Sequence, residues 1–150
     1  MKEKPRLFLD ACVLVTAANS PTGGSARLLA VAAQRRVLLF ATATILKEAQ
    51  KNIVDLLGHA LWQWFFKSLE PLPLHLVDCP SSKEQEAWQK VTHGKDTHVL
   101  AGAIKGSADI LISLDRKHIL NPEVQKNFTI PIMTPGEFLQ KYKLISPGTE

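Results

Sequence analysis

Short apolar runs rich in β-branched residues alternate along this chain with longer stretches in which apolar residues recur at helical spacing. The strands of a parallel sheet are covered on both faces and read as continuous apolar runs, whereas the crossover helices between them keep a polar side. The alternation therefore predicts an α/β fold built on a parallel sheet. The runs that predict strands are residues 6–10, 37–40, 76–77, 109–113 and 130–133.

Helical periodicity covers most of the chain between these runs. Glycine or proline ends several of the helical segments, and two segments start with a hydroxyl residue followed three positions later by glutamate, which is the spacing of a capping box. The predicted helices are residues 25–36, about 44–57 and 59–70, together with segments that begin at Ser81, Asp96 and Thr134.

Apolar stripes indicate which side of each helix faces the sheet. In the segment 59–70, Trp64 points off the apolar side, so we expect it to be exposed and to mark a homodimer or partner surface. In the segment 44–57, an adjoining polar side is formed by Thr44, Glu48, Lys51 and Asp55. The residues expected to be buried are Ile45, Ala49, Ile53, Leu56, Leu57, Leu61, Trp62, Phe65, Phe66, Leu69, Val99, Leu100, Ala103 and Ile104.

The length and composition fit one compact domain. With 150 residues and 45% hydrophobic content, residues 1–150 are expected to form a single domain. No apolar run reaches the roughly 18 to 20 uncharged residues of a membrane helix, which predicts a soluble, unsecreted, cytoplasmic protein without a membrane partner. Cys12, placed within a predicted strand, and Cys79, after another, lack the close spacing of a zinc site and are expected to be reduced thiols.

The net charge adds little by itself. A formal charge of +4 and a pI near 9.2 favour a polyanionic partner only weakly, since many basic proteins bind none. No two of the five histidines have the spacing of a metalloprotease site, and His118, three residues after Asp115, is the least ordinary of them.

Four acidic residues carry the chemistry. Asp10 interrupts an apolar strand, where an unpaired carboxylate would be destabilising, and Asp115 follows the predicted strand 109–113. The ligand crevice of an open parallel sheet lies outside the carboxyl ends of its strands, and Glu48 and Asp96 could reach the same crevice from their helices. Clustered carboxylates repel one another unless a cation neutralises them, and an all-oxygen set suits Mg²⁺ or Mn²⁺.

Each acid alone also has an ordinary structural interpretation. Asp10 could simply end a strand, and Asp96 could cap a helix. Asp115 could cap the turn that begins at Arg116, and Glu48 could be solvated surface. The combination and its order along the chain, rather than any single residue, therefore point to a site.

Four segments resemble the successive motifs of the PIN-domain ribonuclease family. They read FLDACVL at 8–14, TILKE at 44–48, DTHVLAGA at 96–103 and ADILISLD at 108–115, and together they span nearly the whole chain. The resemblance implies a three-layer α/β/α sandwich with a central parallel sheet, a Mg²⁺ or Mn²⁺ site and hydrolysis of RNA phosphodiester bonds. The metal-binding and catalytic carboxylates that it implies are Asp10, Glu48, Asp96 and Asp115.

Many stand-alone domains of this size in the family are VapC-like toxins that a small antitoxin holds inactive, so an antitoxin partner is expected by analogy. Cys12 stands where the family often carries a small polar residue, and Ser113 where threonine is frequent. Ser113 and Thr44 are candidates to orient a carboxylate or the substrate, with a helix cap as the alternative for Thr44. The candidates for RNA binding, with ordinary solvated surface as the alternative, are Lys47, Lys95, Arg116 and Lys117.

Three other functions compete with this interpretation. Haloacid dehalogenase-like phosphatases carry a second aspartate two residues after the first, where this chain has Cys12. A nucleotide-binding domain is disfavoured because Gly23 and Gly24 do not make the glycine fingerprint that holds a pyrophosphate. A PIN-like module that binds RNA or protein without cutting it remains open, although the presence of all four acids disfavours it.

Overall fold

The computed structural model describes residues 4–142, and within them five strands form one fully parallel sheet. The strand order is β3-β2-β1-β4-β5, so the first strand lies in the middle. The predicted parallel sheet is confirmed, with strand bounds that differ from the expected ones by a few residues. The strands are β1 (Arg6–Leu9), β2 (Leu38–Thr42), β3 (Leu74–Val77), β4 (Ile110–Ile112) and β5 (Ile132–Met133).

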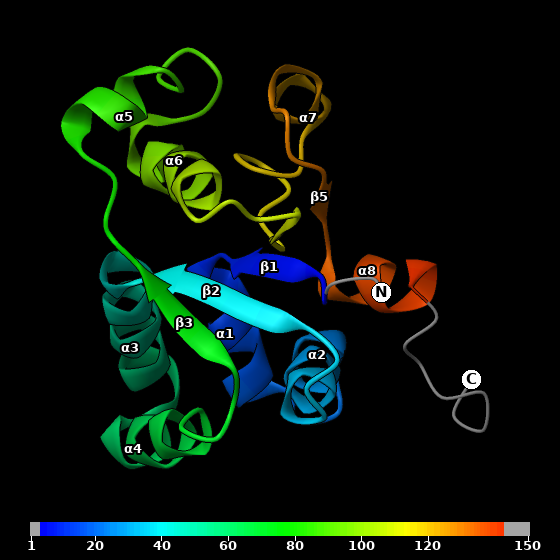
Figure 1. Cartoon of the computed structure of the whole chain (residues 1–150). Coiled ribbons are helices and arrows are strands. Elements are labelled where there is room, and N and C mark those ends of the chain that lie inside the picture. Colours follow the sequence, from blue (N-terminus) through cyan, green and yellow to red (C-terminus); the bar gives the residue numbers. More distant parts are fainter. Residues whose placement is uncertain (1–3, 143–150) are drawn as a thin grey trace.

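Helices cover both faces of the sheet and produce the expected three layers (Figure 1). The helices α1 to α4 lie on one face, α5 to α7 lie on the other, and α8 packs against α2. None of the helices described is long and apolar enough to cross a membrane. Their bounds are α1 (Ala11–Asn19), α2 (Gly24–Ala33), α3 (Ala43–Leu57), α4 (His59–Ser68), α5 (Ser82–Glu86), the 3₁₀ turn η1 (Gly94–Asp96), α6 (Thr97–Lys105), α7 (Pro122–Asn127) and α8 (Pro135–Lys141).

The sequence analysis did not predict the helices α1 and α7. The placement of Cys12 in a strand is wrong, because the chain leaves β1 at Leu9 and starts α1 at Ala11, with Asp10 as the N-cap. The apolar run from strand to helix is nearly continuous, so its periodicity does not mark the boundary. The short helix α7 was also missed, although Asn121 caps it and Pro122 occupies its first turn.

The expected buried sides of the helices are correct except near helix ends. Leu56 is 59% exposed, and Ile104 is also exposed, although both were expected in the core. Each lies in the last turn of its helix, and periodicity identifies the side that faces the sheet but not how far along the helix the sheet extends. Phe66 is exposed too, where it stacks on Trp62 with ring centroids 5.1 Å apart. Trp64 is 66% exposed, as predicted.

The strand register places the acidic residues that follow β1 and β4 at one edge of the sheet. Leu9 of β1 lies beside Ile112 of β4, and the next backbone amide, that of Asp10, donates to the Ile112 carbonyl at 3.0 Å. Because parallel strands present their carboxyl ends at the same edge, Asp10 and the residues after β4 are neighbours there. The prediction that Asp10 and Asp115 follow adjacent strands at one edge is confirmed.

The packing of α6 on β1 depends on a glycine. Gly102 is buried against the ring of Phe8, and a Cβ at this position would lie 2.6 Å from Phe8 Cζ. Phe8 is fully buried in the central strand, so the ring has little room to move. The side chain of residue 102 is thus limited to a hydrogen atom by the close approach of α6 to the sheet.

We expect Gly102→Ala to lower the free energy of unfolding by about 1 to 2 kcal/mol, because the overpacking cost exceeds the helix-propensity gain of roughly 1 kcal/mol. The matched control is Gly136→Ala in α8, where nothing lies within 4 Å of the added Cβ and stability should be unchanged or slightly raised. Urea unfolding of both variants measures the difference. Equal stabilities of the two variants would contradict the packing argument.

Candidate active site

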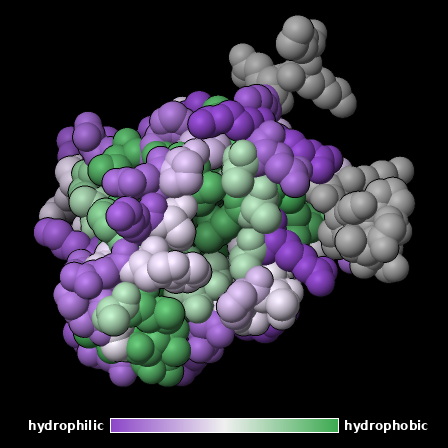
Figure 2. Space-filling model, turned by 90° about the horizontal axis from the view of Figure 1, so that it is seen from below, coloured by the Kyte–Doolittle hydropathy of each residue, from purple (hydrophilic) through white to green (hydrophobic). Residues whose placement is uncertain are grey.

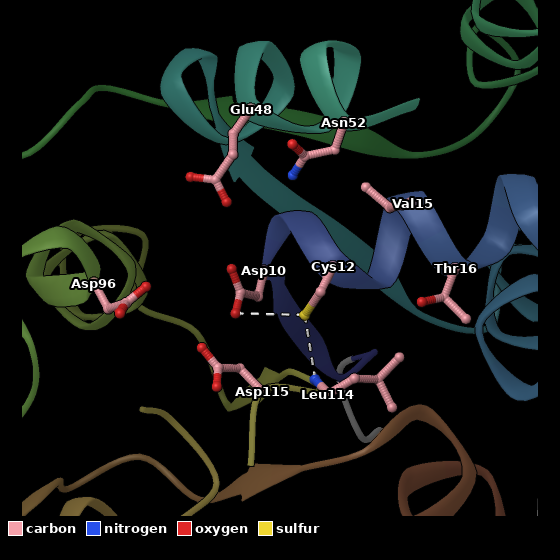
Figure 3. A pocket seen from close by; sticks show the side chains of 9 residues that line it. All are labelled: Asp10, Cys12, Val15, Thr16, Glu48, Asn52, Asp96, Leu114 and Asp115. Carbon is pink, nitrogen blue, oxygen red and sulfur yellow. Dashed lines mark hydrogen bonds between the residues drawn. The ribbon is translucent and has the colours of Figure 1, made fainter. Parts of the chain in front are cut away.

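The four acids predicted from the sequence line one cavity of about 350 Å³ at the carboxyl edge of the sheet. Asp10 follows β1, Asp115 follows β4, Glu48 lies on α3, and Asp96 is the last residue of η1. Their carboxyl groups point toward one another across the cavity (Figure 3). Residues separated by up to 105 positions in sequence are therefore gathered into one place by the sheet and its crossover helices.

Asp10 is held most firmly. It is only 5% exposed, and each carboxylate oxygen accepts a hydrogen bond at 2.8 Å, Oδ1 from the backbone N–H of Ala11 and Oδ2 from the hydroxyl of Ser113. Burial raises the pKa of Asp10, whereas the hydrogen bonds from Ser113 and Ala11 oppose that rise. Asp10 thus caps α1 and faces the cavity at the same time.

Ser113 connects two of the acids. Its buried hydroxyl donates to Asp10 and accepts the backbone N–H of Asp115 at 3.0 Å. The orienting role expected for Ser113 is consistent with these two bonds. The carboxylate of Asp115 in turn accepts the N–H groups of Lys117 and His118 on Oδ1, at 3.1 and 3.0 Å, so it also caps the following turn.

Asp96 occupies the N-cap position of α6, but its side chain makes no capping hydrogen bond. Its Oδ2 instead lies 3.4 Å from Nδ1 of His118, which is also 3.5 Å from Oδ2 of Asp115. Burial first, and the charge of Asp115 second, raise the pKa of Asp96. The alternative interpretation of Asp96 as a simple helix cap is therefore not what the geometry shows.

Glu48 approaches from the helical layer below the sheet. Its carboxylate is half-exposed and lies 4.0 Å from Nε2 of His98. Burial first, and the charge of Asp10 second, raise its pKa. Asn52, one turn later on α3, places its amide beside Glu48 in the same cavity (Figure 3).

Cys12 contributes a neutral thiol to the wall of the site. Burial first, and the charge of Asp10 second, raise its pKa to about 12. The sulfur accepts the backbone N–H of Leu114 at 3.3 Å, and the thiol donates toward Asp10 at 3.6 Å. Cys12 therefore supports Asp10 without adding a charge.

The donor set fits a hard divalent cation. Burial first, and the charges of neighbouring acids after it, raise the pKa values of Asp10, Glu48 and Asp96, and a cation among these carboxylates would favour their ionised forms. One oxygen each of Asp96 and Asp115 and a nitrogen of His118 lie within 4.8 Å of one another, close enough to share an ion. Carboxylate oxygens suit Mg²⁺ or Mn²⁺, and an imidazole ligand is compatible with Mn²⁺ more than with Mg²⁺.

Thr44 takes a different position from the one expected. Its hydroxyl lies 3.3 Å from the sulfur of Cys79, and its side chain is exposed. The helix cap that was the alternative for Thr44 belongs to Thr42, whose hydroxyl accepts the N–H of Ile45 at 3.1 Å. Sequence periodicity could not separate the two threonines, because both precede the apolar stripe of α3.

Asn52 and His98 are site residues that sequence reasoning did not include, and His118 was noted for its distance of three residues from Asp115 but was not assigned to the site. Asn52 was detectable, since it follows Glu48 by one helical turn. His118 lies three residues after Asp115, so that contact is local, whereas its contact with Asp96 and the contact of His98 with Glu48 arise from tertiary structure. Within residues 4–142, none of the four candidate RNA-binding residues forms an ion pair, and only Arg116 among them lines a cavity of those described.

Comparisons with known proteins agree with this architecture. VapBC2 from Rickettsia felis, solved bound to a DNA fragment from its promoter, is similar with a TM-score of 0.60 and 15% identity, over 86% of this chain and 98% of that chain. PAE2754 from Pyrobaculum aerophilum is similar with a TM-score of 0.63 and 16% identity, over 93% of this chain and 90% of that one. A search of curated protein sequences gives no match.

At these identities the two structures establish the likeness of fold alone. The family assignment comes from the sequence, because the family model described as the PIN domain matches residues 6–117, which include all four acids. The parallel sheet, the acids at its carboxyl edge and this match lead to one assignment: the chain belongs to the PIN domain family.

Proposed function

We propose that this protein is a divalent-metal-dependent endoribonuclease that hydrolyses phosphodiester bonds of RNA. The observation that carries the proposal is the convergence of Asp10, Glu48, Asp96 and Asp115 in one cavity, where burial and mutual repulsion raise the pKa of three of them. A protein that only bound RNA would gain nothing from such a cluster, since it repels phosphate. A bound cation reverses that effect.

The four carboxylates would hold Mg²⁺ or Mn²⁺, with His118 as an additional candidate ligand to the pair Asp96 and Asp115. When bound, the metal lowers the pKa of a water molecule and neutralises the negative charge that develops on the phosphate. Ser113 and the Ala11 amide fix the orientation of Asp10, and the turn after β4 fixes Asp115. The protein's own contribution is thus a set of ligands oriented before substrate arrives.

RNA would be attracted by basic residues outside the acidic cavity. Arg116 and Lys117 directly follow Asp115, Lys47 precedes Glu48, and Lys95 precedes Asp96, so each acid other than Asp10 has a basic neighbour in sequence. Contacts of this kind position the phosphate backbone and do not read the base sequence. The proposal therefore covers RNA as a substrate class and includes no sequence preference.

A protein partner fits the apolar surface of the α1–α4 side, where hydrophobic patches interrupt the polar surface (Figure 2). Trp64 and Phe66 on α4 and Leu76 on the edge strand β3 are exposed. Next to them, a groove of about 190 Å³ is lined by Leu46, Phe66, Leu69, Glu70, Leu72, Leu74 and Leu76. We propose that this surface takes a second copy of the chain or a small antitoxin, the partner expected from the resemblance to VapC-like toxins.

Asp10→Asn should reduce RNA cleavage at least about 100-fold, beyond the 10- to 100-fold typical of losing a group that only supports a ligand. Without metal the variant should be as stable as the wild type or more so, because asparagine keeps the helix cap and removes a buried charge. The measurements are cleavage of a mixed RNA pool with Mg²⁺ or Mn²⁺, and thermal midpoints in chelator.

The matched control is Asp78→Asn, which alters an exposed aspartate just after β3, outside the cavity. It should leave cleavage unchanged. Full activity of Asp10→Asn would refute the catalytic assignment, and cleavage by the wild type in chelator would refute the metal dependence.

The raised pKa values predict how stability depends on pH. A carboxyl group whose pKa is higher in the folded than in the unfolded chain keeps its proton longer when folded. Ionisation therefore costs stability as the pH rises from the ordinary values of 3.8 for aspartate and 4.5 for glutamate through the folded pKa. The pKa values of Glu84 and Glu137 are lowered, so these groups change the stability in the opposite direction as the pH rises. The effect of one acid is therefore measured as the difference in stability between its variant and the wild type at each pH.

We expect the stability of Asp96→Asn, relative to wild type in chelator, to increase as the pH rises from 4 toward neutrality. Saturating Mg²⁺ should remove or reverse this advantage, because the ion stabilises the intact site. Chemical denaturation at several pH values gives both quantities. A relative stability that falls with rising pH in chelator would contradict the electrostatic account of the cavity.

Trp64→Ala should weaken self-association at least about tenfold, since an exposed tryptophan at the centre of an interface typically contributes 2 kcal/mol or more. Sedimentation equilibrium over a range of protein concentrations measures the effect, with the neighbouring exposed residue Gln63→Ala as the control. If the wild type stays monomeric at every concentration, the second copy is excluded as the partner of this surface.

A further inference from the structure

A second cavity of about 250 Å³ adjoins the acidic one. The two share Thr16 and Leu114 as common walls, and Asp115 lines the first while Arg116 lines the second. The second cavity has no carboxylate among its lining residues, in contrast to the first. Those residues are Thr16, Gly24, Ser25, Leu114, Arg116, Thr134, Pro135 and Gly136.

The N-terminus of α2 opens onto this second cavity. Helix α2 has ten residues, and its N-cap, Gly23, has no side chain to accept a hydrogen bond from the first turn. Among the described residues, no acceptor is found for the backbone N–H groups of Gly24, Ser25 and Ala26. Unpaired amides at a helix start, together with the helix dipole, favour an anion.

An independent observation at the same place is the hydroxyl of Ser25. The residue lines the cavity, is 2% exposed, and its Oγ has no hydrogen-bond partner among the described residues. Buried hydroxyls are almost always paired, and an unpaired one is destabilising. A ligand that accepts this hydrogen bond would satisfy it.

The charge around the cavity also favours an anion. Arg116 is exposed and can reach a ligand with several N–H donors in a fixed fork. Two carboxylates lie near the cavity without lining it: Asp115 faces the acidic cavity, and Oε1 of Glu137 accepts the backbone N–H of Thr134 at 2.9 Å in the capping box of α8. That hydrogen bond first, and the charge of Arg116 last, lower the pKa of Glu137. Backbone amides, a buried hydroxyl and a guanidinium therefore border the same cavity, whose lining includes no carboxylate.

We propose that this cavity is a phosphate-binding subsite that holds a backbone phosphate of the RNA strand next to the one being cleaved. The inference rests on the proposed nuclease function for the identity of the ligand. The amides of Gly24 and Ser25 and the Ser25 hydroxyl donate to the phosphate oxygens, and Arg116 neutralises their charge. The subsite sets the register of the strand relative to the acids without reading its bases.

Inorganic phosphate tests the subsite without RNA. It is titrated into metal-free protein in chelator, so that the repelling carboxylates exclude it from the acidic cavity, and ¹H–¹⁵N spectra are recorded. The amide resonances of Gly24, Ser25 and Ala26 should shift together and saturate in the wild type, and should do so only at much higher phosphate concentration in Ser25→Ala. The subsite would be refuted if these amide resonances did not shift, or if Ser25→Ala saturated at the same phosphate concentration as the wild type.

RNA binding provides the second test. Anisotropy of a labelled single-stranded RNA in chelator should show affinity about tenfold weaker for Ser25→Ala, as expected for a lost hydrogen bond to a charged group. Gly24→Ala should also weaken binding, because its methyl group fits at 3.4 Å from the Gly136 nitrogen but narrows the cavity. The control is Ser82→Ala, an exposed serine in the first turn of α5, which should bind RNA like the wild type.

Thermal midpoints separate loss of binding from loss of folding. Ser25→Ala should be as stable as the wild type or more so, since it removes an unpaired buried hydroxyl. Arg116→Gln should reduce the slope of log affinity against log salt by about 0.7, the value for one phosphate contact on a single strand. RNA affinity of Ser25→Ala and Gly24→Ala equal to that of Ser82→Ala would refute the proposal.

The two proposals fail in different ways. Cleavage by the wild type, combined with phosphate and RNA binding that is insensitive to Ser25 and Gly24, would overturn the subsite and leave the nuclease intact. Phosphate binding at the start of α2 without any RNA cleavage would support the anion site and overturn the nuclease. A Ser25→Ala defect confined to RNA with a 5′-phosphate would identify a terminal phosphate and overturn the internal one.

Discussion

The parallel pairing of β1 with β4 is the constraint on which the rest of the site depends. It sets Leu9 beside Ile112, so that the residues just past the two strands meet at one edge of the sheet. Ser113 then reaches Asp10 with its hydroxyl and holds the Asp115 amide with its oxygen. A slip of one residue in this register would turn Ser113 to the opposite face and separate the two acids.

The cavity is arranged at the expense of stability in the metal-free protein. Asp10 is almost completely buried, and the hydrogen bonds from Ser113 and Ala11 only partly offset the cost of its charge. Asp96 leaves the first turn of α6 without a side-chain cap, although an aspartate at that position could supply one. Local stability is thereby given up in favour of carboxylates that face a common cavity, an arrangement that fits the metal site proposed above.

The charge distribution around the carboxyl edge is asymmetric. The acidic cavity attracts cations and repels phosphate, whereas the adjoining cavity at the start of α2 offers amides, a hydroxyl and a guanidinium. The short segment from Leu114 to Arg116 lines both, with Asp115 on one side and Arg116 on the other. In the two proposals above, two consecutive residues would serve a metal and a phosphate, and the turn after β4 would set the spacing between the two sites.

The sequence alone determined the α/β class, the order of the strands along the chain, the capping boxes of α5 and α8 and the four acids, because periodicity, capping and motif chemistry are local. It did not determine where β1 ends, since the apolar run passes into α1 without a break, nor that Leu56 and Ile104 lie beyond the cover of the sheet. Only tertiary structure brought His118 against Asp96 and left the Ser25 hydroxyl unpaired in a residue that lines the same cavity as Arg116. These contacts join segments far apart in sequence, and no local pattern encodes which side chains strand register and helix packing bring together.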